Sequence, residues 1–107
     1  MRRFGQICKV KPDGLADYAR YHANPIPGVN EMIKACNLQN YSIYSIGDLL
    51  FTYCEYVGED YDADMAKMAA DPTTQKWWGM VTPLMEKFEI REGGGPWTDM
   101  KEIYHLD

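Results

Sequence analysis

The stretch YSIYSIGDLLFTYCEYV, residues 41–57, decides the fold that this sequence predicts. Its two halves, residues 41–46 and 49–57, are rich in the β-branched and aromatic residues that favour strands. Between them stands Gly47-Asp48, a pair typical of a tight turn. The stretch therefore predicts an antiparallel hairpin at the centre of a sheet.

The flanking sequence predicts helices and further strands on both sides of this hairpin. Asp13 is expected to cap the first helix, and Pro25 must interrupt the chain after it, because a residue before proline is pushed out of the α region. The predicted elements are a strand at Phe4–Val10, a helix at Leu15–His22, a helical piece at Pro27–Ala35, helices at Tyr61–Ala70 and from Pro72 towards Met85, the latter bent or ended near Pro83, and a strand at Lys101–His105.

The predicted order is strand, helix, strand, strand, helix, strand, which is the split β-α-β pattern of ferredoxin-like folds. A chain of 107 residues has room for a single domain, residues 1–107. We therefore expect an α+β, ferredoxin-like domain of the dimeric α/β-barrel type, with an antiparallel sheet and its helices on one face. The other face of such a sheet would be uncovered, and a second copy of the chain would bury it, so we expect a homodimer.

Composition argues against several kinds of partner. The net charge is −5, and the acidic and basic residues are interspersed, which argues against nucleic acid and against an anionic membrane surface. No run approaches the ~20 apolar residues of a membrane span, and the N-terminus lacks an apolar signal segment. We expect a cytoplasmic protein, and neutral small molecules remain open as its ligands.

The sequence offers no metal or nucleotide motif, so we expect no cofactor. The two histidines, His22 and His105, are far apart, and His105 is expected to be structural. The run Gly93-Gly94-Gly95-Pro96 lacks the strand-to-helix setting of a phosphate loop and is interpreted as a flexible connector. Three widely spaced cysteines fit neither a disulfide scaffold nor a metal knuckle, and we expect them to be reduced packing residues. They are Cys8, Cys36 and Cys54.

The doublet Trp77-Trp78 suggests a ligand. Adjacent residues on a helix point about 100° apart, so one core cannot easily take both rings. A ring left in a cleft offers a flat face and an indole N–H, which suit the C–H faces and hydroxyls of a sugar. The doublet can equally be one core residue beside one rim residue; in a binding site we expect Trp78 to lie nearer the pocket.

Tyr18 and His22 are four residues apart on the first predicted helix and share one of its faces. The break at Asn24-Pro25 puts His22 near a helix end, where an imidazole can reach into a cleft and both give and take a proton near neutral pH. On these residues alone, the pair can also be an ordinary half-exposed helix surface.

The predicted hairpin carries two tyrosines and a carboxylate of interest. Tyr41 and Tyr44 are three residues apart in a strand and face opposite sides of the sheet, so only one of them can share a cleft with His22. Glu55 shares a face with Tyr53. We expect Glu55 to be a rim charge rather than a ligand-binding group.

Taken together, four motifs closely resemble the L-rhamnose mutarotase family over nearly the whole chain. They are Tyr18-x-x-x-His22, Asn40-Tyr41-Ser42-Ile43-Tyr44, Asp71-Pro72-x-x-Gln75-Lys76-Trp77-Trp78, and Trp97-x-x-Met100-x-Glu102-x-Tyr104-His105-Leu106. The resemblance implies a metal-free and cofactor-free ferredoxin-like homodimer that interconverts the α and β anomers of a 6-deoxy-hexose such as L-rhamnose. It also implies roles for five residues: His22 as the catalytic acid, and Tyr18, Tyr41, Trp77 and Trp78 as substrate-binding residues.

One departure from the family leaves the sugar open. Ile26-Pro27-Gly28 stands where the family usually has Trp-Pro-Glu, so an aromatic ring and a carboxylate are missing beside the expected pocket. L-Fucose is therefore a candidate beside L-rhamnose. Because this fold hosts unrelated functions, two alternatives remain: an oxygenase-like enzyme of the dimeric α/β-barrel type, and a non-catalytic sugar-binding module.

Overall fold

The computed structural model describes residues 1–89 and 95–107, and it contains the predicted split β-α-β order. All strand pairs are antiparallel, and the sheet order is β2-β3-β1-β4, with β5 also paired to β1. The elements are β1 (Arg2–Val10), α1 (Leu15–Ala23), α2 (Val29–Ala35), β2 (Leu38–Ile46), β3 (Leu49–Tyr56), α3 (Tyr61–Ala70), α4 (Pro72–Val81), a 3₁₀ turn (Thr82–Leu84), β4 (Met85–Glu86) and β5 (Thr98–Met100).

The predicted hairpin at the centre of the fold is confirmed. Strands β2 and β3 pair directly from Ile46 opposite Leu49, and Gly47 makes the turn with a φ of +57°, a left-handed conformation that glycine adopts most readily. Residues in β3 alternate between buried and half-buried positions along its whole length. One face of the hairpin therefore packs on the core, and the other face looks away from it.

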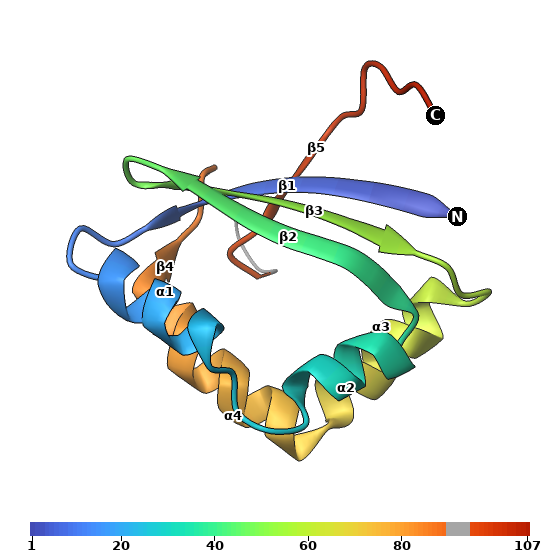
Figure 1. Cartoon of the computed structure of the whole chain (residues 1–107), viewed down its shortest axis with the longest axis horizontal. Coiled ribbons are helices and arrows are strands. Elements are labelled where there is room, and N and C mark those ends of the chain that lie inside the picture. The colour runs from blue at the N-terminus through green and yellow to red at the C-terminus, as the bar shows by residue number, and fades with distance from the viewer. Residues whose placement is uncertain (90–94) are drawn as a thin grey trace.

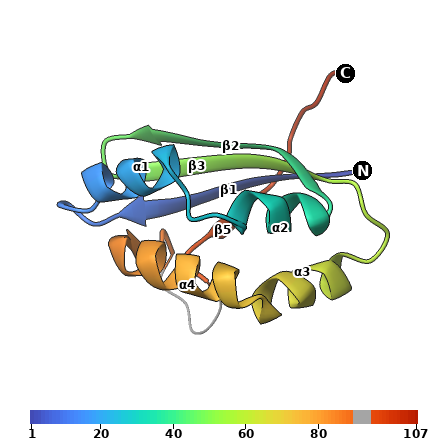
Figure 2. The ribbon, with the colours of Figure 1, turned by 60° about the horizontal axis from the view of Figure 1, so that its bottom comes forward.

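The helices lie on one face of the sheet, as predicted, and the C-terminal segment lies on the other side (Figure 1). Helices α3 and α4 run nearly end to end beneath the sheet (Figure 2), because Asp71-Pro72 interrupts the backbone between them. Asp71 then caps α4, since its carboxylate accepts a hydrogen bond from the Thr74 N–H at 2.9 Å.

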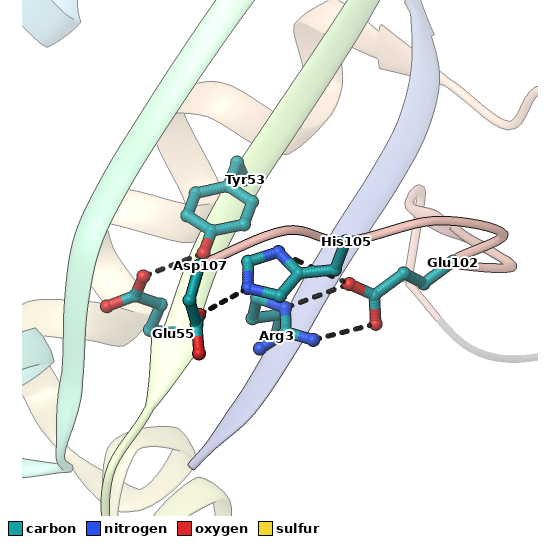
Figure 3. Close-up of polar contacts among 6 residues, drawn as sticks. All are labelled: Arg3, Tyr53, Glu55, Glu102, His105 and Asp107. Atoms are coloured by element: carbon teal, nitrogen blue, oxygen red, sulfur yellow. Dashed lines mark hydrogen bonds and ion pairs between the residues drawn. The ribbon is translucent and has the colours of Figure 1, made fainter.

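The last strand was predicted at Lys101–His105, and this prediction is wrong. Strand β5 lies at Thr98–Met100, where it pairs with Gly5–Ile7 of β1, and residues 101–107 have no regular structure. A strand needs a neighbour's backbone groups as well as suitable side chains. Beyond Met100, the chain leaves the edge of β1 and crosses the outer face of the sheet (Figure 3).

The start of α1 also differs from the prediction, whereas the end of α4 agrees with it. Gly14, not Asp13, is the N-cap of α1, and no side chain caps that end, because a backbone turn from Lys11 to Gly14 already leads into the helix. Helix α4 ends at Val81, near Pro83, as predicted. Pro83 stands inside the 3₁₀ turn that follows, and its missing N–H cannot continue an α-helix.

Two remaining predictions concern cysteines and the glycine run. All three cysteines are free and buried, which confirms them as packing residues, and burial raises the pKa of the Cys8 thiol to about 12. The proposed connector at Gly93–Pro96 begins outside the described residues. Within residues 1–89 and 95–107, every helix is too short or too polar to cross a membrane.

Candidate functional site

A cavity of about 1200 Å³ lies between the sheet and the helices. All five residues singled out from the sequence line it, although they come from three different elements: Tyr18 and His22 from α1, Tyr41 from β2, and Trp77 and Trp78 from α4. The lining is mainly apolar and aromatic with a few polar groups, which is the usual composition of a small-molecule site.

His22 is held in one orientation by its own helix. Its Nδ1 lies 2.7 Å from the carbonyl oxygen of Tyr18, and its ring packs on the Tyr18 ring with centroids 4.3 Å apart. A carbonyl can only accept, so Nδ1 must carry the proton of this hydrogen bond. In the neutral ring, Nε2 is then unprotonated and able to accept a proton from a ligand.

Tyr18 forms the wall beneath this imidazole. It is only 4% exposed and belongs to the core cluster under α1 and α4. The pKa of its hydroxyl is raised mainly by burial and to a smaller extent by the neighbouring Cys8 and Tyr41. The phenol therefore stays neutral and can both donate and accept a hydrogen bond at the cavity surface.

A β-bulge turns Tyr41 towards the cavity. The pairing of β2 with β3 shifts register between Gln39 and Ser42, and Asn40 adopts a φ of +49°, a conformation in which asparagine is enriched among non-glycine residues. Tyr41 lines the cavity; Tyr44 pairs with Phe51 on the outer face of the hairpin and is 65% exposed, although it also borders the cavity. Tyr41 is 40% exposed, yet burial raises its pKa to about 12, so its hydroxyl end lies deep while part of the ring faces outward.

Glu55 holds this bulge from the outer side of the sheet. Its carboxylate accepts hydrogen bonds from Asn40 Nδ2 at 2.6 Å and Gln39 Nε2 at 3.1 Å. It also accepts one from the Tyr53 hydroxyl at 2.7 Å, which Figure 3 shows. These bonds, that of Tyr53 foremost, lower the pKa of Glu55. The sequence reasoning treated Glu55 as a rim charge and missed this role; the amide pair Gln39-Asn40 was the available signal.

The two tryptophans point in different directions, as expected. Trp77 is 7% exposed and belongs to the core cluster, and its ring meets the His22 ring edge-on with centroids 5.0 Å apart. Trp78 is 41% exposed and forms the rim of the cavity. Of the two, Trp77 is therefore the one whose ring contacts His22.

The position that departs from the family pattern lies beside this end of the cavity. Ile26 packs against the core cluster, and Pro25 and Val29 on either side of it line the cavity. The cavity wall is therefore apolar at Pro25 and Val29, and Asn30 is the polar residue beside them.

His105 lies outside the cavity, on the outer face of the sheet. Its Nε2 lies 2.7 Å from an Asp107 carboxylate oxygen, and its Nδ1 lies 3.9 Å from Glu102, which itself pairs with Arg3 (Figure 3). Across the described part of the chain, no three histidine, cysteine, aspartate or glutamate side chains cluster closely enough to hold a metal ion.

Comparison with known proteins points to one family. A family model described as L-rhamnose mutarotase matches residues 3–106. The chain is 31% identical over 109 residues to an L-rhamnose mutarotase of Lactiplantibacillus plantarum, with 100% of both chains covered. It is 33% identical over 109 residues to one of Shouchella clausii, with 99% of each covered.

Two solved structures share the fold. The crystal structure of an L-rhamnose mutarotase from Formosa agariphila superposes with a TM-score of 0.78 at 16% identity, and 100% of both chains is covered. A NIPSNAP family protein from Agrobacterium tumefaciens gives a TM-score of 0.60 at 17% identity, covering 79% of this chain and 76% of its own. At these identities, the likeness establishes the fold and nothing further.

Proposed function

Because the chain belongs to the L-rhamnose mutarotase family, we propose that its cavity binds a 6-deoxy-hexose and that His22 exchanges protons with it. The activity is the interconversion of the α and β anomers of a sugar such as L-rhamnose, an isomerase reaction. The comparisons favour neither the oxygenase-like alternative nor the binding module. The observation that carries the proposed residue role is the hydrogen bond from His22 Nδ1 to the Tyr18 carbonyl.

This hydrogen bond suits the chemistry that mutarotation requires. His22 Nε2 accepts the proton of the anomeric hydroxyl, and a proton is delivered to the ring oxygen as its bond to C1 breaks, which gives an open-chain aldehyde. Rotation about the C1–C2 bond and reclosure, with the reverse proton transfers, yield the other anomer. Both oxygens are attached to C1, so one imidazole is close enough to serve both.

The other four residues are proposed to hold the sugar. The neutral hydroxyls of Tyr18 and Tyr41 offer hydrogen bonds to sugar hydroxyls, and the Trp77 and Trp78 rings offer faces to its C–H groups. L-Rhamnose is the first candidate and L-fucose the second, since the apolar wall at Pro25 and Val29 lacks the carboxylate usual in the family.

We also propose that the protein works as a homodimer. On the outer side of the sheet, Tyr44, Ile46 and Met100 are exposed, and so are Ile103 and Leu106 of the C-terminal segment. Packing these surfaces against a second copy would remove apolar area from water, and a stable interface buries about 1,600 Å² in total. Sedimentation equilibrium should give twice the chain mass, and Ile46→Glu should shift the protein towards monomer; a monomeric parent chain would contradict the proposal.

We also propose that the protein is located in the cytoplasm. Its three cysteines are free and buried and are not paired in disulfides, as is usual for proteins of that compartment.

Saturation-transfer NMR tests the activity directly. One anomeric proton signal of L-rhamnose is saturated, and the loss of intensity at the other anomer measures the exchange rate. We expect purified protein to accelerate this exchange without added metal, for L-rhamnose and in a parallel sample for L-fucose. Exchange at the buffer rate for both sugars would refute the proposal.

A further inference from the structure

The interior of this domain is divided between two clusters of buried side chains. One cluster contains Cys8, Leu50 and Val81 and lies under α1 and α4; the other contains Cys54 and Met68 and lies beneath α3. The cavity of about 1200 Å³ is lined by residues of both clusters. It therefore extends from one end of the sheet's inner face to the other.

The residues with proposed sugar roles occupy only one end of this cavity. Tyr18, His22, Trp77 and Trp78 belong to α1 and α4. The far end is lined by other side chains, none of which has a proposed role so far. They are Phe4, Leu38, Cys54, Tyr61, Met65 and Met68.

Tyr41 stands between the two ends, because Leu38 on one side of it in β2 belongs to the far cluster and Ile43 on the other side packs against the near one. It is close enough to Tyr18 to help raise the pKa of that phenol. Cys54 and Tyr61, at the far end, help in turn to raise the pKa of Tyr41, although burial is the larger cause for both tyrosines. A sugar bound between His22 and Tyr41 would therefore leave the space beyond Tyr41 unfilled.

The volume of the cavity also indicates that a single sugar leaves part of it unfilled. Even if each of its eleven non-hydrogen atoms took the ~30 Å³ of a liquid water molecule, a 6-deoxy-hexose would need only about 330 Å³. That is under a third of the 1200 Å³ present. Protein interiors are otherwise close-packed, so this remaining space belongs to solvent or to a further part of the ligand.

The walls of the far end favour an apolar group. Phe4 and Tyr61 stack with centroids 5.1 Å apart, and the Arg2 guanidinium lies over both rings, at 4.9 Å and 4.7 Å. Met65 and Met68 add flexible thioether side chains that adapt to the shape of an apolar ligand and contact aromatic rings well. Among these six side chains, only the Tyr61 hydroxyl and the Cys54 thiol can donate a hydrogen bond, and the methionine sulfurs are weak acceptors, so the six would leave most hydroxyls of a second sugar unsatisfied.

We propose that the far end is a second subsite for an apolar alkyl or aryl group carried on the 6-deoxy-hexose itself. The inference rests on the proposed function, which puts C1 at His22 and requires a free anomeric hydroxyl. The group must then be attached away from C1, and C4 is the ring atom opposite C1, so a substituent on O4 extends farthest from His22 along the cavity. The substrates accommodated include reducing 6-deoxy-hexoses bearing an ether at O4.

The experiment compares L-rhamnose with 4-O-benzyl-L-rhamnose by saturation-transfer NMR. We expect both to exchange faster than in buffer, with the KM of the benzyl ether lower by about tenfold, because its ring is buried against Phe4 and Tyr61. Absence of acceleration for both sugars would refute the proposed function. Acceleration of L-rhamnose with an equal or higher KM for the benzyl ether would overturn the second subsite alone.

A pair of variants on α3 locates the subsite. Met65→Trp should fill the far end and remove the tenfold advantage of the benzyl ether, whereas Ala66→Trp, on the exposed side of the same helix, should keep it. An advantage that persists in Met65→Trp would overturn the assignment.

The unmodified protein offers an independent readout that does not depend on any variant folding. The ¹³C-methyl signals of Met65 and Met68 should shift with 4-O-benzyl-L-rhamnose and much less with L-rhamnose. Equal shifts with both sugars would equally overturn the second subsite.

Discussion

Replacement of His22 by asparagine isolates the proton-transfer step. The side-chain amide of asparagine can keep the hydrogen bond that Nδ1 donates to the Tyr18 carbonyl at 2.7 Å, but it has no counterpart of Nε2. A positioned acid/base contributes about 10²–10⁴-fold to a rate. We therefore expect the enzymatic exchange rate of L-rhamnose to fall by that factor, which at about 1.4 kcal/mol per tenfold corresponds to about 3–5 kcal/mol of barrier.

The stability cost of this change can be estimated from the two ring contacts that it removes. The His22 ring packs on Tyr18 and meets Trp77 edge-on, and such ring pairs are each worth about 0.5–1.5 kcal/mol. Their loss would lower the free energy of unfolding by about 1–3 kcal/mol, against a typical total of about 5–15 kcal/mol. The Asn variant should therefore remain folded.

His22→Phe serves as the matched control, since it keeps a ring between Tyr18 and Trp77 but cannot transfer a proton. Urea unfolding measures the stability of both variants, and saturation transfer measures their exchange. Both should lose the acceleration although the Phe variant keeps more of the ring packing. If the Asn variant, folded and at saturating sugar, exchanged anomers at the parent rate, His22 would have no part in the reaction.

Three further changes follow from the same geometry. Trp77→Ala should lower the free energy of unfolding by about 3–5 kcal/mol because the Trp77 ring is in the core. Trp78→Ala should mainly raise the KM for L-rhamnose, because the Trp78 ring is at the rim. Equal effects of the two variants on urea unfolding would contradict this difference. Glu55→Ala should release the β-bulge and reduce kcat/KM by up to about 10²-fold with little change in helix content by circular dichroism; unchanged kinetics would show that the bulge holds without it. The hydrogen bond from Tyr56 is the largest cause of the lowered pKa of Asp64, so the Asp64 carboxylate stabilises the fold above the usual aspartate pKa, and this stabilisation is lost as pH falls through the lowered value. Asp64→Asn should reduce the loss of stability at acid pH measured by urea unfolding. An unaltered pH profile would disprove the linkage.

The sequence was sufficient for features that depend on neighbouring residues. The hairpin around Gly47-Asp48 and the helical spacing that stacks His22 on Tyr18 both follow from local backbone preferences. The motifs spread along the chain were also sufficient to indicate the family. The two tryptophans were correctly expected to diverge, because adjacent helix positions must.

Only the tertiary structure decided which of these groups meet. The contact of Trp77 with His22 joins α4 to α1, and the bulge beside Tyr41 is bonded through Asn40 to Glu55, which lies in the neighbouring strand. The last strand formed at Thr98–Met100, where β1 offered a free edge, and not at the later run of strand-forming residues. Local propensities act on each segment alone, whereas these features arise from hydrogen bonds and packing between segments far apart in the sequence, and no single segment contains that information.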